Sequence, residues 1–176
     1  MQKKIIYLDR DGVINEDFGY VYKIENFKFC EGVFEACREF LALGYEIIIV
    51  TNQSGIGREY YSEDEFLELS KYMRNEFKKE NIDILKVYYC PHNPDDNCSC
   101  RKPKAGMILQ SLNDFNIDLA NSWLIGDKKS DIECAKNGKI GNSVLISKED
   151  KKHKECFVAK NLFDSLKYIK EKNEVQ

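Results

Sequence analysis

Two short runs of branched apolar residues, 4–8 and 46–50, constrain the fold of this chain more than any other feature. Neither run alternates apolar with polar side chains, so each predicts a strand that is buried on both faces of a sheet. Between them, apolar residues recur at helical spacing over 33–41, and Gly44 stands where that helix would end. This strand–helix–strand order indicates a parallel sheet with a right-handed crossover.

The same alternation continues along the rest of the chain. Ser62 and Glu65 form a capping-box pair at the start of a helix whose apolar face runs over 66–77. The pattern then predicts strands at 84–89, 123–125 and 143–146, and helices at 106–115, 130–137 and 162–170. A charged stretch at 148–154 is expected to be mobile. We therefore expect one domain over 1–176, with an α/β, three-layer, Rossmann-like parallel sheet and helices on both faces.

Polar clusters follow the first four predicted strands, at 9–11, 51–57, 90–102 and 127–131. Because the carboxyl ends of parallel strands meet at one edge of a sheet, these segments should converge there and form a binding site.

Four acids stand in two of these clusters: Asp9, Asp11, Asp127 and Asp131. Acids gathered this closely repel one another unless a cation lies between them, and Mg²⁺ suits carboxylates, water and a phosphate oxygen. In such a site one carboxylate can attack phosphorus while another protonates the leaving oxygen. A single Asp-Gly pair is more typical of a turn, but acids at two strand ends favour a phosphoryl-transfer site.

The second cluster has the composition of a phosphate cradle. The Thr51 hydroxyl, a main-chain N–H near Asn52 and the Lys102 amine together suit a phosphoryl group. The Ser-Gly-x-Gly run that follows Gln53 is, by itself, usually only a loop.

Three thiols and an imidazole lie close together in the third cluster: Cys90, His92, Cys98 and Cys100. They are a complete tetrahedral ligand set for zinc, with no open position for water. We therefore expect a structural Zn²⁺ that orders this loop and presents Arg101 and Lys102 to the substrate. The alternative is a set of incidental surface thiols. The other cysteines of the seven are expected in the core or at the surface.

The charge balance argues against several classes of partner. A net charge of −3 and a pI near 5.6 supply no basic field for nucleic acid or an anionic membrane. No apolar run is long enough to span a bilayer, and the first residues do not read as a secretion signal. Reduced thiols fit the cytoplasm, so a cytoplasmic protein with a small anionic substrate is expected.

Five segments give the sequence a family resemblance: LDRDGVIN at 8–15, GYV at 19–21, TNQSGIGR at 51–58, the cysteine segment through RKP at 90–103, and GDK with Asp131 at 126–131. On these residues the chain resembles the haloacid dehalogenase superfamily of phosphatases. Within it, the chain resembles the heptose 1,7-bisphosphate phosphatases and their histidinol-phosphatase relatives. Relatives commonly have glycine where Glu59 stands and often proline where Ala105 stands.

The resemblance implies a role for each matching residue. Asp9 would form an aspartyl-phosphate, Asp11 would act as acid and then as base, and Asp9, the Asp11 carbonyl and Asp127 would hold Mg²⁺. Contacts to phosphate and substrate would come from Thr51, Asn52, Gln53, Ser54, Arg101 and Lys102. Lys128 and Asp131 would order the site without touching the substrate. The spacing between motifs leaves no room for the cap domain of many superfamily members, so the zinc loop would take its place.

The implied activity is removal of the 7-phosphate of D-glycero-D-manno-heptose 1,7-bisphosphate, in nucleotide-activated heptose synthesis for lipopolysaccharide or another surface polysaccharide. The protein is expected to be a monomer that binds a sugar phosphate. Histidinol-phosphate phosphatase is the alternative, since it shares nearly all these motifs. A polynucleotide 3′-phosphatase would need a basic strand-binding groove, and a non-catalytic sugar-phosphate sensor would be expected to lack Asp9 or Asp11. The anomer at C1 stays open.

Overall fold

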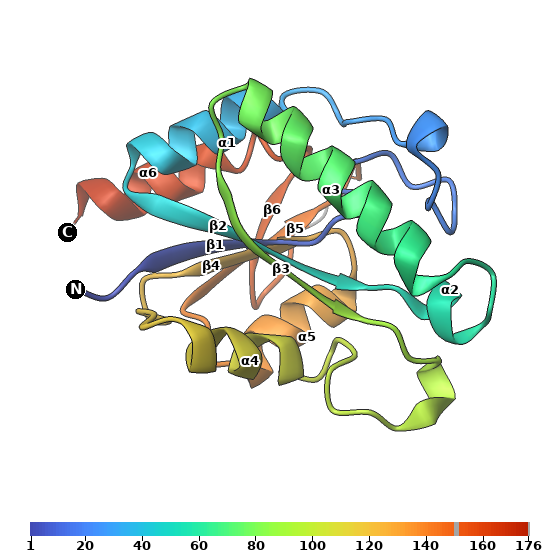
Figure 1. Ribbon diagram of the computed structural model, residues 1–176. Coiled ribbons are helices and arrows are strands. Elements are labelled where there is room, and N and C mark those ends of the chain that lie inside the picture. Colours follow the sequence, from blue (N-terminus) through green and yellow to red (C-terminus); the bar gives the residue numbers. More distant parts are fainter. Residues whose placement is uncertain (150–151, 176) are drawn as a thin grey trace.

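A computed structural model describes residues 1–149 and 152–175 (Figure 1). These residues form a parallel six-stranded sheet in the order β3-β2-β1-β4-β5-β6. The strands are β1 (Lys4–Leu8), β2 (Tyr45–Asn52), β3 (Ile84–Cys90), β4 (Trp123–Gly126), β5 (Asn142–Ile146) and β6 (Phe157–Ala159). The helices are α1 (Val33–Ala42), α2 (Ser54–Gly57), α3 (Glu63–Lys79), α4 (Gly106–Asp114), α5 (Lys129–Asn137) and α6 (Leu166–Glu174), with single 3₁₀ turns at Ile24–Asn26 and Pro94–Asp96.

Helices cover both faces of the sheet (Figure 1). Side chains of β1 alternate between two apolar cores, as a fully buried strand requires. Ile6 and Leu8 pack in the core beneath α1, α3 and α6, whereas Ile5 and Tyr7 pack in the core beneath α4 and α5. The expected three-layer α/β architecture is confirmed.

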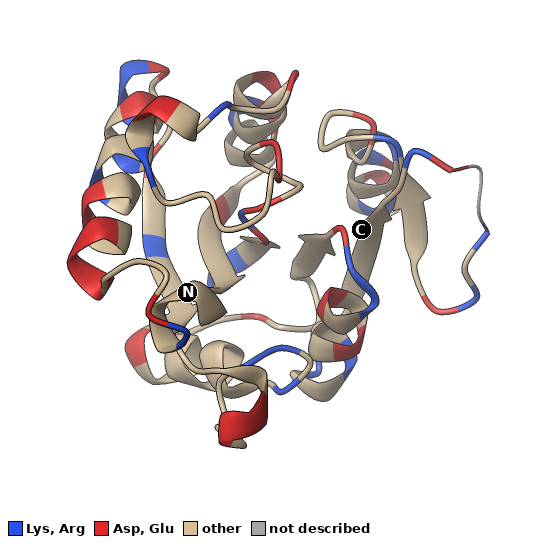
Figure 2. Ribbon diagram, turned by 90° about the vertical axis from the view of Figure 1, so that its right-hand side faces the viewer, with Lys and Arg blue, Asp and Glu red and all other residues tan. Residues whose placement is uncertain are grey.

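The order of the strands reverses at β1, which pairs with β2 on one side and with β4 on the other. Such a switch point leaves a crevice at the carboxyl ends of the two central strands. The N–H of Asp9 donates to the carbonyl of Ile125 at 3.0 Å, so the end of β1 is tied to the end of β4. Figure 2 faces this edge of the sheet and shows Asp and Glu as well as Lys and Arg on the loops and helix ends around it.

Local sequence signals act where they were expected. Gly44 adopts φ +81° after α1, a conformation that costs glycine little. At the start of α3, the Glu65 N–H donates to the Ser62 hydroxyl at 3.1 Å, and the Ser62 N–H donates to the Glu65 carboxylate at 2.8 Å. The predicted capping box is present.

Three elements differ from the expectation. β6 was not predicted, because three residues after a charged stretch give no periodicity to recognise. Residues 54–57, expected as loop, form one helical turn. The last helix begins at Leu166 rather than at 162, since Leu162 enters the core from a turn. Of the stretch expected to be mobile, Asp150 and Lys151 lie outside the described residues.

Within the described residues, every helix is too short or too polar to cross a bilayer.

Candidate active site

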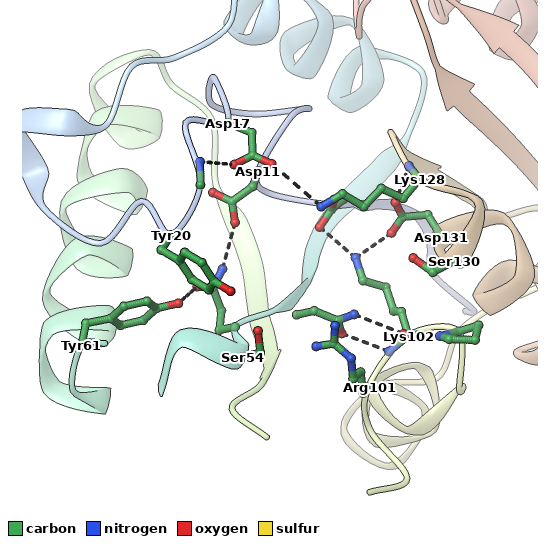
Figure 3. Close-up of a pocket in the computed structure, with 15 residues that line it drawn as sticks. Asp11, Asp17, Tyr20, Ser54, Tyr61, Arg101, Lys102, Lys128, Ser130 and Asp131 are labelled. Carbon is green, nitrogen blue, oxygen red and sulfur yellow. Dashed lines mark hydrogen bonds and ion pairs between the residues drawn. The ribbon is translucent and has the colours of Figure 1, made fainter. Parts of the chain in front are cut away.

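The carboxyl ends of the central strands surround a cavity of about 480 Å³ (Figure 3). Asp9 follows β1, Asn52 ends β2, Lys102 comes from the loop after β3, and Asp131 lies in the first turn of α5. The structure therefore brings all four polar segments to one edge of the sheet.

Lys102 lies at the centre of the site and is only 4% exposed. Its Nζ donates to Asp9 Oδ1 at 2.8 Å, to Asp131 Oδ1 at 2.6 Å and to the Val50 carbonyl at 2.9 Å. Burial alone lowers the pKa of this amine, but the carboxylates of Asp9 and Asp131 outweigh burial and raise it above its usual value. Lys102 is therefore a fixed positive charge beside the predicted nucleophile.

Negative charge remains in excess around Lys102. Burial, followed by the neighbouring Asp131, raises the pKa of Asp9 well above its ordinary value, although Lys102 opposes this. Burial also raises the pKa of Asp127. One lysine does not balance the two buried carboxylates of Asp9 and Asp131 and the half-buried carboxylate of Asp127, so the site fits a further cation.

These carboxylates are not equally available to that cation. Ligand oxygens of Asp9, Asp127 and Asp131 lie within 4.8 Å of one another. Asp131 is already engaged, since Oδ1 accepts from Lys102 and Oδ2 accepts from the Lys128 N–H at 3.1 Å. In contrast, Asp127 Oδ1 is buried and has no hydrogen-bond partner among residues 1–149 and 152–175. The Asp127 carboxylate lies so close to Gly12 that a Cβ there would come 2.2 Å from Oδ2, which explains the glycine.

Asp11 lines the same cavity and is held by three donors. Arg10 Nη2 and Asn15 Nδ2 donate to Oδ1 at 2.8 and 3.0 Å, and Gln53 Nε2 donates to Oδ2 at 3.0 Å. Arg10 is 1% exposed, and its guanidinium lies 5.8 Å from the ring centre of Phe66. The sequence analysis did not assign Arg10 a role, although its place between two acids at the end of a buried strand was a usable signal.

Asn52 and Gln53, expected to contact substrate, both line the cavity, and their side chains also form hydrogen bonds within the protein. Asn52 Oδ1 accepts from the Lys102 N–H at 3.0 Å, and its Nδ2 donates to the Lys102 carbonyl at 3.2 Å, so it holds the backbone that carries the central amine. Gln53 bonds Asp11, Thr51 and Tyr61. Thr51 is buried, and its hydroxyl accepts from Gln53 at 2.9 Å.

The rim of the cavity carries the remaining residues. Ser54, Arg101 and Lys128 line it, as do Tyr20 and Ser130, which were not singled out from the sequence. Lys128 Nζ lies 3.8 Å from an oxygen of Asp17 on the opposite loop. Arg101 Nη1 is buried without a hydrogen-bond partner. The rim thus offers cationic groups above the acidic floor.

The Cys and His side chains of the third cluster converge, with ligand atoms within 4.8 Å of one another. The Cys90 and Cys98 sulfurs are 3.6 Å apart, Cys90 Sγ is 3.5 Å from His92 Nδ1, and His92 Nδ1 is 3.2 Å from Cys100 Sγ. A tetrahedron with Zn–S of about 2.3 Å and Zn–N of about 2.0 Å separates its ligand atoms by roughly 3.5–3.8 Å, within about 0.3 Å of these distances. The cluster therefore has the dimensions of a zinc site.

Known proteins match both the sequence and the fold. The HAD-hydrolase-like family model matches residues 99–164. The D-glycero-alpha-D-manno-heptose-1,7-bisphosphate 7-phosphatase of Campylobacter jejuni is 50% identical over 98% of this chain and 99% of its own. The D-glycero-beta-D-manno-heptose-1,7-bisphosphate 7-phosphatase of Pasteurella multocida is 42% identical over 96% and 97%.

Among solved structures, the D,D-heptose 1,7-bisphosphate phosphatase from B. bronchiseptica, complexed with magnesium and phosphate, has the same fold. Its TM-score is 0.85 at 24% identity, over 96% of this chain and 99% of that one. Relatives of such identity along nearly their whole length decide the assignment: the chain belongs to the heptose-1,7-bisphosphate 7-phosphatase family of haloacid dehalogenase-like phosphatases.

Proposed function

We propose that this phosphatase removes the 7-phosphate of D-glycero-D-manno-heptose 1,7-bisphosphate through an aspartyl-phosphate on Asp9. The observation that carries the mechanism is the arrangement on the cavity floor. A buried carboxylate, Asp9, lies 2.8 Å from a fixed amine, and Asp127 Oδ1 has no partner beside it. The names of the relatives support the choice of substrate, and the family resemblance is the basis on which we assign the reaction to nucleotide-activated heptose synthesis.

The chemistry divides into two displacements. First, a carboxylate oxygen of Asp9 bonds to phosphorus while the bond to the C7 oxygen breaks, and that oxygen takes a proton from Asp11. In the second displacement, water attacks the same phosphorus, Asp11 accepts its proton, and the bond to Asp9 breaks to release phosphate. Lys102 and the Thr51 hydroxyl offset the charge that develops on the phosphoryl oxygens in both steps.

Mg²⁺ fits the residues present. Asp9 and the unpartnered oxygen of Asp127 would hold it, together with the main-chain carbonyl of Asp11 that the family resemblance assigns. When bound, the ion offsets charge on the phosphoryl group. Asp131, which bonds Lys102 and the Lys128 N–H, orients the amine and need not touch the ion.

Two cations on the rim favour a second phosphate on the substrate. Within the part of the chain that the structure describes, Arg101 has a buried nitrogen without a hydrogen-bond partner, and Lys128 has a long contact to Asp17 at 3.8 Å. The 1-phosphate of a heptose bisphosphate would pair with these groups, whereas histidinol phosphate has an amine and an imidazole instead. A basic rim therefore favours the bisphosphate.

The test is phosphate release with Mg²⁺ from both anomers of the heptose bisphosphate and from histidinol phosphate. We expect kcat/KM for at least one anomer to exceed that for histidinol phosphate by about 100-fold or more, since two charged contacts are lost and each costs about 1.5–3 kcal/mol. A preference for histidinol phosphate would replace the proposed substrate with the alternative.

We also propose that Cys90, His92, Cys98 and Cys100 hold a structural zinc ion. In Cys98→Ser we expect bound zinc, measured by elemental analysis, to fall well below one per chain. Losing this cross-link should cost roughly 2–3 kcal/mol, or a fall in melting temperature of about 5–10 °C. Cys156→Ser, outside the cluster, should keep its zinc. Full melting temperature and full activity in a zinc-free protein would contradict the proposal.

A further inference from the structure

Gln53 is 3% exposed, and every polar atom of its side chain is bonded within the protein. Its Nε2 donates to Asp11 Oδ2 at 3.0 Å and to Thr51 Oγ1 at 2.9 Å. Its Oε1 accepts from the Tyr61 hydroxyl. Figure 3 shows Tyr61 and Asp11, the two ends of this series of contacts, on the same side of the cavity.

These contacts suit only one orientation of the amide. Turned by 180°, Gln53 would place its oxygen against an oxygen of Asp11, and while Asp11 is ionised neither atom would have a hydrogen to share. The Tyr61 hydroxyl also favours the observed orientation, because it donates a hydrogen bond to the amide oxygen of Gln53. Burial raises the pKa of Tyr61 to about 12, so this hydroxyl keeps its proton at neutral pH.

The tyrosine itself is fixed by packing. It is 5% exposed, and its ring stacks on Tyr22 at 5.0 Å with an interplanar angle of 10°. The other side of the ring meets Gly55, where a Cβ would lie 2.1 Å from Cε1. Neighbouring Tyr60 is exposed and contacts Tyr20 edge-on. It is therefore not part of the hydrogen-bond series from Tyr61 through Gln53 to Asp11.

We propose that Tyr61 and Gln53 are positioning residues that hold the Asp11 carboxylate in place for proton transfer to the leaving oxygen. Arg10 and Asn15 bond only Oδ1, so Gln53 is the side-chain donor that fixes Oδ2. The inference rests on the proposed function for the role of Asp11, and it assigns Gln53 to the protein's acid rather than to the substrate.

The test compares two leaving groups. Release of a primary sugar alkoxide needs a proton from Asp11, whereas release of p-nitrophenolate does not. Tyr61→Phe keeps the ring and removes the hydroxyl, and Gln53→Leu keeps the shape and removes the donor. A general acid contributes about 100-fold to 10,000-fold, so we expect kcat/KM for the heptose bisphosphate to fall about tenfold in Tyr61→Phe and about 100-fold in Gln53→Leu.

With p-nitrophenyl phosphate, the same variants should lose no more than about threefold in kcat/KM. Tyr60→Phe is the matched control and should leave kcat/KM unchanged for both substrates. Equal losses on both substrates, or no loss on the sugar phosphate, would overturn the inference while the wild-type reaction stands. Failure of the wild-type protein to release phosphate from either substrate with Mg²⁺ would instead refute the proposed function.

Discussion

Asp9→Asn is expected to lower kcat for phosphate release by about 10,000-fold or more, because an amide does not form the phosphorus bond that a carboxylate oxygen forms. Residual hydrolysis would come from the remaining phosphate contacts acting on water. The measurement is single-turnover and steady-state phosphate release with saturating Mg²⁺. Asp83→Asn, at an exposed position outside the cavity, is the matched control and should keep full activity.

The fold of the Asp9→Asn variant should survive. Asparagine has the shape of aspartate, and Lys102 keeps its bonds to Asp131 and to the Val50 carbonyl. Burial raises the pKa of Asp9, which means that its charge is unfavourable in the metal-free protein. The melting temperature without metal should therefore stay level or rise. Turnover above about 1% of wild type in a folded variant would exclude Asp9 as the nucleophile.

Much of this fold follows from short-range patterns. The runs at 4–8 and 46–50 had to be buried strands, and Ser62 with Glu65 marked the start of α3. Because the carboxyl ends of parallel strands meet at one edge of the sheet, the sequence alone predicted that three segments lie together: Asp9, the Thr51 segment and Asp127. The later elements were harder, since β6 and the turn before α6 depend on what they pack against.

The direction of side chains could not be predicted in the same way. Asn52 and Gln53 stand in a motif that resembles a substrate loop, and they line the cavity, but their amide bonds to Lys102 and Asp11 were not predicted. Which way an amide points depends on donors brought from distant segments, here the Lys102 backbone and Tyr61. Arg10 is a similar case, because its place beside Phe66 appears only after α3 has packed.

Lys102→Met is expected to reduce both stability and activity, unlike Asp9→Asn. Methionine matches the length of the stem but leaves Asp9 and Asp131 buried without their shared cation. Breaking a buried ion pair in this way costs about 3–5 kcal/mol, which corresponds to a fall in melting temperature of roughly 10–15 °C without metal. Loss of the charge beside the phosphoryl group should lower kcat by about 100-fold to 1,000-fold.

Mg²⁺ should distinguish this explanation from simple loss of packing. Three carboxylates without a lysine attract a divalent cation more strongly, so added Mg²⁺ should raise the melting temperature of Lys102→Met more than that of wild type. Lys71→Met, at an exposed position on α3, is the control and should match wild type in both measurements. Two results would show that the amine does not balance the buried acids: a melting temperature within about 2 °C of wild type, or a rise with Mg²⁺ no larger than that of wild type. Leaving two buried carboxylates without their cation should lower the melting temperature by more than about 2 °C.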